Sequence, residues 1–237
     1  MNVPHAPERL GVGLALAIAV SGFGSPTPTM QAPPPAWAGW ARCEIQVQGT
    51  GYSEQQTHTW TMTGGAPSSE GAFRVYAGTW NVVGKGSLQR SQGSQSLVAE
   101  WAINATRPAP LAVFVRASDG RMFIQARHAQ LRQAGAIAGY QQQIIDGKPQ
   151  SPGKIGAEAF EWAFPVIDAA ATSTTVNGSS TPAVNGSVGY MQQGGARGSA
   201  SCTWQFGQGA AAPAPPPQLE AVSIPVPGTN GAGPRRR

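Results

Sequence analysis

The stretch Cys43-Glu44-Ile45-Gln46-Val47-Gln48 alternates strictly between apolar and polar side chains. Successive side chains of a β-strand point to opposite faces, so this pattern predicts a strand with one buried and one exposed face. Ser201-Cys202-Thr203-Trp204-Gln205-Phe206 repeats the pattern near the other end of the chain. Both cysteines fall on the apolar face, which directs them toward a common core.

Export is indicated by the N-terminal sequence. Leu10–Val20 reads LGVGLALAIAV, an uncharged apolar run that follows Arg9. It is shorter than the roughly 20 residues that span a bilayer, and it matches the hydrophobic region of a secretory signal peptide. We therefore expect a signal peptide over residues 1–24, with a buried or interfacial helix as the alternative. The mature chain is expected to lack a transmembrane segment and to be secreted, periplasmic or part of the cell envelope.

The two cysteines are the only ones in the chain. In an exported protein such a pair is expected to form one disulfide, here between Cys43 and Cys202. Their Cα atoms should then lie about 4.4–6.8 Å apart. Two buried free thiols are the less favoured alternative, and the apolar strand context argues against a catalytic thiol.

The composition divides the chain into segments. Residues 25–39 are Pro-rich and predict a linker, whereas residues 40–208 predict one β domain closed by the disulfide. Residues 209–237 are rich in Ala, Pro and Gly and end in three arginines, which predicts a disordered basic tail. The net charge of +5 is partly due to this tail, since 43–208 holds 11 basic and 9 acidic residues. The charge is therefore weak evidence for nucleic-acid binding.

Further segments with strand-like alternation or β-branched residues lie at 57–63, 73–76, 79–83, 96–105, 111–117, 121–131 and 136–145. Short strands at this spacing predict an all-β domain, and we favour an antiparallel β-sandwich over a closed β-barrel. Residues 148–156 are expected to form a loop. Ala157–Phe164 is rich in Ala and Glu and precedes Pro165, which favours a short helix over a strand. Residues 169–190 contain Asn177-Gly178 and Asn185-Gly186, which predict an edge hairpin or a long loop.

Asp119-Gly120 separates two apolar-rich runs and predicts a type I′ hairpin turn. The resulting register puts Val113 opposite Ala126 and Val115 opposite Ile124 on the core face. The outer face then gathers aromatic and basic side chains, namely Phe114, Arg116, Arg121, Phe123 and Arg127. Aromatic and arginine side chains interleaved on a sheet are typical of polyanion-binding surfaces, so this face is our candidate for binding a cell-surface glycan or other polyanion. The alternative is that a second sheet, or 157–164, covers the two phenylalanines.

The sequence contains no HExxH, CxxC or GxSxG motif, and we assign no catalytic residue, metal or cofactor. His58 and His128 both fall on inward strand faces, where a hydrogen-bonded core histidine is the simplest interpretation. No motif resembles that of a characterised family. The sequence therefore favours an exported, non-enzymatic β-domain with a binding or structural role. The alternatives are a β-barrel carrier of a small apolar ligand and a secreted hydrolase that uses Glu158, Glu161 or His128.

Overall fold

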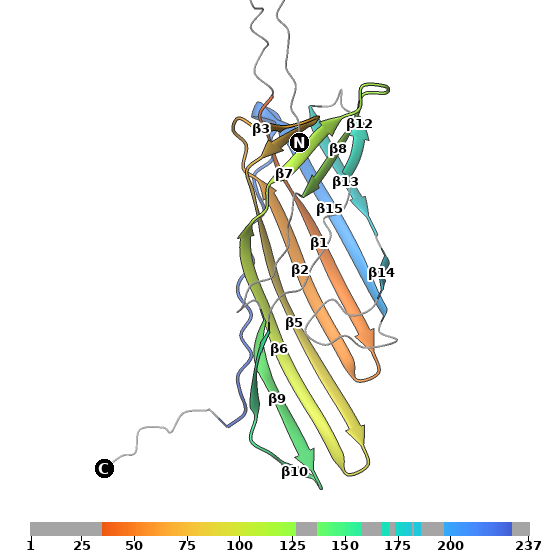
Figure 1. Cartoon of the computed structure of the whole chain (residues 1–237), viewed down its shortest axis with the longest axis vertical. Helices are drawn as coiled ribbons and strands as arrows, with labels where there is room; N and C mark the ends of the chain where they lie inside the picture. Colours follow the sequence, from red (N-terminus) through yellow and green to blue (C-terminus); the bar gives the residue numbers. More distant parts are fainter. Residues whose placement is uncertain are drawn as a thin grey trace, which may run out of the picture. The chain divides into compact units, whose positions relative to one another are not determined.

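The computed structural model describes residues 35–126, 137–157, 167–170, 174–181, 183–185 and 197–228. All of them belong to one compact unit, Pro34–Arg237. These residues build two antiparallel sheets, which confirms the all-β prediction (Figure 1). The helical content of the described part of the chain is one 3₁₀ turn, Gly209–Ala211.

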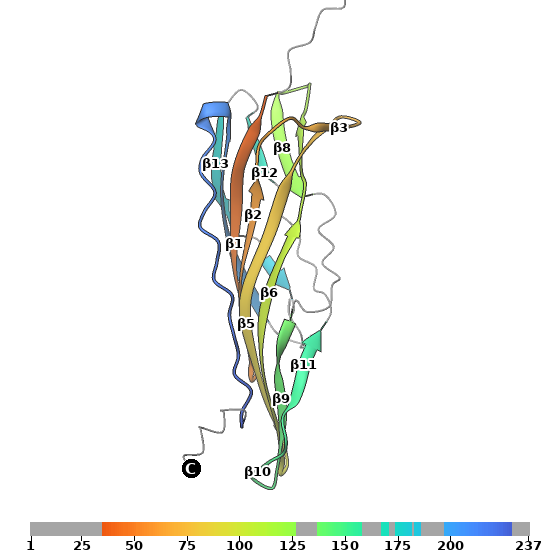
Figure 2. The same cartoon turned by 90° about the vertical axis from the view of Figure 1, so that its left-hand side faces the viewer.

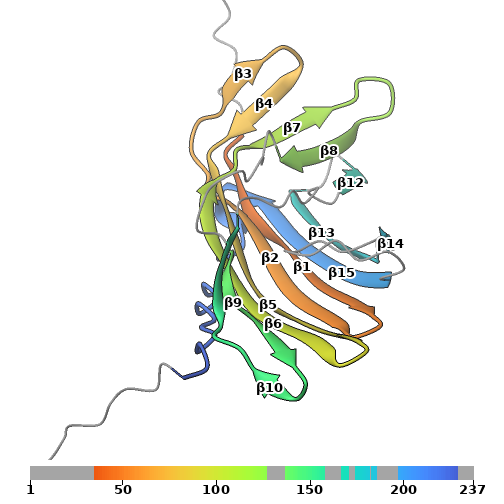
Figure 3. The same ribbon diagram turned by 60° about the horizontal axis from the view of Figure 1, so that its bottom comes forward.

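The larger sheet has the order β10-β9-β6-β5-β2-β1-β15-β13, with β11 also beside β9 and β14 also beside β15. Its strands are β1 (Trp37–Gly49), β2 (Tyr52–Met62), β5 (Gly78–Gln92), β6 (Gln95–Pro108), β9 (Ile137–Ile145), β10 (Lys148–Pro149), β11 (Gly153–Ala157), β13 (Thr175–Ser180), β14 (Ala183–Asn185) and β15 (Arg197–Gln208). The long strands curve along their length (Figure 3). Among the described strands the two edges do not pair with each other, so the closed-barrel alternative is wrong for this sheet.

The smaller sheet has the order β12-β8-β7-β4-β3. Its strands are β3 (Ser68–Glu70), β4 (Phe73–Tyr76), β7 (Leu111–Val115), β8 (Arg121–Ala126) and β12 (Ile167–Ala170). Both sheets contribute to one hydrophobic core, which holds Leu111 and Ile124 of the smaller sheet and Trp60 and Trp80 of the larger. Two antiparallel sheets that share a core are what a β-sandwich requires.

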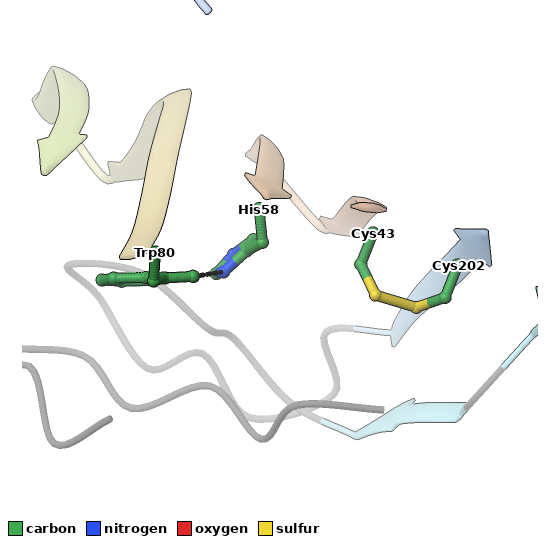
Figure 4. Close-up of a disulfide and its surroundings, with 4 residues drawn as sticks. All are labelled: Cys43, His58, Trp80 and Cys202. Carbon is green, nitrogen blue, oxygen red and sulfur yellow. Dashed lines mark hydrogen bonds between the residues drawn. A yellow bond between two sulfur atoms is a disulfide. The ribbon is translucent and has the colours of Figure 1, made fainter. Parts of the chain in front are cut away.

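The predicted disulfide is confirmed. Cys43 of β1 lies directly opposite Cys202 of β15, and their fully buried side chains form the bridge (Figure 4). Their Cα atoms are 4.0 Å apart, slightly closer than we expected. The two residues are paired partners on neighbouring antiparallel strands, so strand pairing already brings their backbones close together. The bridge therefore joins two strands that are already adjacent, although its ends are 159 residues apart in sequence.

The predicted register of the β7–β8 hairpin is wrong by two residues. Phe114 lies opposite Phe123, and residues 116–120 connect the two strands. A type I′ turn needs positive φ at both central residues. Gly120 has it (φ 68°), but the only non-glycine residue with positive φ in the described part of the chain is Asp146. A shift of two preserves the faces of the strands. Val113 and Ile124 are buried as predicted, whereas Ala126 is only partly buried, and Val115 at the strand end (50% exposed) and Ala117 in the loop are exposed, so those parts of the core assignment are wrong.

The type I′ geometry occurs instead at Asp146-Gly147, with φ of 49° and 73°. This turn pairs Ile145 with Lys148 and returns the chain along β9. Residues 148–156, which we predicted as loop, therefore include β10 and most of β11. The prediction failed because this segment is short and lacks the alternation of apolar residues on which strand assignment depends.

Three segment boundaries also differ from the prediction. β1 begins at Trp37, inside the predicted linker, because this side chain is buried and its backbone pairs with Gln208. Asn177-Gly178 lies within β13 rather than at a turn, and Gly178 packs beneath the Trp204 indole, where a Cβ would come within 2.7 Å of the ring. The predicted disordered tail has a defined backbone from Gly209 to Gly228.

Several predictions fall on residues outside the described part of the chain. They are the signal peptide over 1–24, nearly all of the Ala157–Phe164 helix, Arg127 and His128. They stay predictions.

Candidate functional site

Strand β2 carries an unusual row of buried polar side chains. Every second side chain from Tyr52 to Met62 is at most 3% exposed, although Glu54, Gln56 and His58 are polar. We call these three residues the β2 polar ladder. The sequence identified only His58 as inward-facing. The alternation extends back to Glu54, but nothing in the sequence distinguishes a buried glutamate or glutamine from an exposed one.

The members of the ladder satisfy one another by hydrogen bonds. The Trp80 indole N–H donates to His58 Nδ1 over 3.2 Å (Figure 4). Because Nδ1 accepts, the ring proton belongs on Nε2, which lies 2.7 Å from Gln56 Oε1. The amide nitrogen of Gln56 then donates to Glu54 Oε1 over 2.5 Å. The chain of bonds is thus directional and defines one tautomer of His58.

Glu54 ends the ladder as an acceptor. Its Oε2 accepts from the Tyr52 hydroxyl and from the Trp101 indole N–H, each over 3.0 Å. Space for the Trp101 indole exists because β5 has Gly86 beneath it, and a Cβ there would come within 2.3 Å of the ring. The short sequence Gly84-Lys85-Gly86 is therefore a strand segment that accommodates a large neighbour.

Burial controls the ionisation of both ends of the ladder. It raises the pKa of the Glu54 carboxyl, and hydrogen bonds from Trp101, Tyr52 and Gln56 oppose this shift. It lowers the pKa of His58 to about 3, so this imidazole is neutral at physiological pH. Both side chains are at most 1% exposed and do not reach solvent. The ladder therefore specifies how the strands pack, because each buried polar group requires its partner.

The same face of the larger sheet opens into a cavity of about 620 Å³ near the tips of the β1–β2 and β5–β6 hairpins. Strand registers define two rows of lining residues, Arg90–Leu97–Gln143 and Gln92–Gln95–Ile145. Leu97 packs against the core and lies four positions before the buried Trp101 on β6. Side chains an even number of positions apart on a strand share a face, so the cavity lies on the inner face of the sheet. We call it the tip cavity.

The tip cavity combines two kinds of lining group. Its glutamines carry amides that both donate and accept hydrogen bonds, and Leu97 and Ile145 add apolar surface. Arg90 contributes a guanidinium. This lining suits a ligand with several hydroxyl or amide groups and a limited apolar face. The sequence did not reveal the site because its residues come from hairpin ends that meet only through strand pairing.

The predicted aromatic and arginine face is largely assembled. The Phe114 and Phe123 ring centroids are 6.2 Å apart, and the Arg116 guanidinium lies 5.3 Å from the Phe123 centroid. Phe73 extends the row, with its centroid 5.6 Å from that of Phe114. We call Phe73, Phe114 and Phe123 the phenylalanine row. All three are half-buried, so this face is neither fully covered nor fully open.

Two carboxylates offset the positive charge of the arginines on this face. Arg116 forms an ion pair with Asp119, and Arg121 Nε lies 2.6 Å from Asp168 Oδ1. The hydrogen bond from Arg116 lowers the pKa of Asp119 to about 2, so the carboxylate stays ionised at physiological pH. These pairs are exposed, and such pairs contribute little to stability. They reduce the local positive charge that a polyanion would need.

The residues of the hydrolase alternative, Glu158, Glu161 and His128, all lie outside the described residues. Within the part of the chain that the structure describes, no group of three or more His, Cys, Asp or Glu side chains is placed to hold a metal ion. The described residues likewise include no helix of the length and apolar character that crossing a bilayer requires.

No protein-family model matches the chain, and neither a curated protein nor a solved structure is similar to it. The described residues define an all-β protein with two antiparallel sheets and an internal disulfide. The argument for a function must therefore rest on the sites themselves.

Proposed function

We propose that this protein is an exported, non-enzymatic binding domain that holds a neutral saccharide in the tip cavity. The observation that carries the proposal is the pair of lining rows, in which three glutamine amides lie beside two apolar side chains. The disulfide is compatible with an oxidising compartment outside the cytosol, as the N-terminal sequence also suggests.

The chemistry of a saccharide complements this lining. A sugar ring presents hydroxyl groups that both donate and accept, and each needs a partner when it leaves water. Glutamine amides supply both functions, while Leu97 and Ile145 offer surface for the apolar C–H faces of the ring. The cavity volume falls within the range of roughly 300–1,000 Å³ that is usual for small-molecule sites.

The first test is the substitution Gln143→Ala. Loss of one amide leaves a ligand hydroxyl without its partner, so we expect saccharide affinity to fall about tenfold. Calorimetric titration against a panel of neutral oligosaccharides measures the change. Gln142→Ala is the matched control, because Gln142 is the neighbouring residue of β9 and its side chain points to the opposite face. The proposal is wrong if no saccharide binds, or if both variants weaken binding equally.

A second candidate function is polyanion binding by the phenylalanine row and its arginines. The stacking of Arg116 on Phe123 favours it, because this pair leaves an aromatic and cationic surface half-exposed. The test is a heparin titration at low salt, where the double substitution Asp119→Asn and Asp168→Asn is expected to strengthen binding severalfold by freeing both arginines. A flat titration for both proteins excludes this function.

A further inference from the structure

A C-terminal segment lies along the outer face of the larger sheet. After the 3₁₀ turn, residues 212–226 form neither helix nor strand, residues 227–228 form a turn, and none of them belongs to either sheet. Figure 2 shows this dark-blue segment running beside the long strands. Its first part, Ala212–Ala221, contains four prolines, which restrict the backbone and remove hydrogen-bond donors.

One side chain fastens this segment to the sheet. Asn104 of β6 donates through Nδ2 to the Val222 carbonyl oxygen and accepts at Oδ1 from the Val222 N–H, both over 2.8 Å. These are the two backbone groups that a neighbouring β-strand would contact. Asn104 therefore recognises an extended backbone in the way that a sheet edge does, although it lies on the face of the sheet.

The side chains around Val222 add a second form of recognition. Val222, Ile224 and Val226 are half-buried, whereas Ser223 and Pro225 between them are exposed. Val222 lines a cavity of about 410 Å³ that also contacts Gln55 and Val83. Ile224 lines another of about 460 Å³ with Lys85 and Glu100. Val222 and Ile224, two β-branched residues at alternate positions, thus share cavities with side chains of the sheet.

We propose that the outer face of β2, β5 and β6 is a binding site for extended peptides with β-branched residues at alternate positions, and that Val222–Val226 is its built-in ligand. Pro225 and Pro227 lack the N–H groups that a regular strand needs, so the segment does not become a further strand of a sheet. Asn104 bonds both backbone groups of Val222, and cavities remain beside Val222 and Ile224. Because the segment is covalently attached, its effective concentration at the site is high even when its intrinsic affinity is low. A free peptide of the same pattern can bind the site once the segment has been displaced.

The test uses full-length protein with Val222→Pro. Proline removes the N–H group that donates to Asn104 Oδ1, so we expect the segment to dissociate from the sheet while the site itself is unchanged. A fluorescent synthetic peptide of residues 216–228 is then titrated and its anisotropy measured. We expect saturable binding to the Val222→Pro protein, and binding at least about tenfold weaker to the wild-type protein and to Asn104→Ala/Val222→Pro. Ser223→Pro is the matched control, because its side chain is exposed, and it should behave like the wild type.

A second measurement does not depend on the proline substitution. Hydrogen exchange at the Val222 amide should be slow in the wild-type protein and at least about tenfold faster in Asn104→Ala. Unprotected exchange in the wild type overturns the proposal, as does equal peptide binding by wild-type and Val222→Pro proteins. Concentration-dependent dimers that Val222→Pro abolishes would also overturn it, because the segment would then occupy the site of a second copy.

Discussion

Replacement of both Cys43 and Cys202 by alanine is expected to lower the free energy of unfolding by about 5 kcal/mol. The bridge closes a loop of 159 residues, so it restricts the unfolded chain considerably more than a short-range bridge would. In the folded state its ends are register partners on β1 and β15. We expect the backbone pairing of these strands to persist without the bridge. The loss is therefore expected to act mainly through the unfolded state, and the fold should survive.

Urea denaturation followed by tryptophan fluorescence measures this effect. The wild-type protein with a reducing agent is the control, since it should approach the stability of the alanine variant, which itself should not respond to reductant. A decrease below about 1 kcal/mol in the alanine variant would contradict the expectation from chain entropy.

Acidification is expected to destabilise the protein through His58. Its folded pKa is about 3, against 6.5 for the exposed side chain. Above pH 6.5 the imidazole is neutral in both states and contributes no pH dependence. Between pH 6.5 and about 3 only the unfolded state takes up the proton, so stability falls by up to about 1.4 kcal/mol per pH unit.

The comparison of wild type with His58→Gln isolates this contribution. Glutamine can accept from the Trp80 indole and donate to Gln56, but it does not titrate. Glu54 acts in the opposite direction, because its raised pKa favours the folded state at low pH and this contribution is lost as pH rises above about 4.5. Glu54 is present in both proteins and cancels in the difference. Stability curves that run parallel between pH 6.5 and 4 would contradict the assignment.

The faces of the strands were predictable from the sequence. Alternation placed Cys43, Cys202 and His58 in the core, and all three are fully buried. This succeeds because the direction of a side chain depends only on its parity along a single strand. The same reasoning identified the phenylalanine row, apart from Phe73, even though the predicted register was wrong, since an error of two residues does not change the face.

Turn geometry was not predictable from dipeptides alone. Asp-Gly occurs at both 119–120 and 146–147, yet only the second adopts the type I′ turn. At the first, the Asp119 carboxylate accepts from the Arg116 side chain and from the Arg121 backbone N–H, within a longer loop. The two Asp-Gly pairs therefore differ in their turn geometry, and the one that is not type I′ has its aspartate bonded to neighbouring arginines.

The sequence by itself determined the strand faces, the cysteine pairing and the all-β class, because each depends on local alternation or on the number of cysteines. Only the tertiary structure decided which distant groups meet. Glu54 is acceptable in the core because Trp101, 47 residues away, donates to it, and Asn104 holds Val222 across 118 residues. The tip cavity likewise exists only where β5, β6 and β9 are in register. Such contacts depend on strand pairing and packing between distant segments, and no local pattern encodes them.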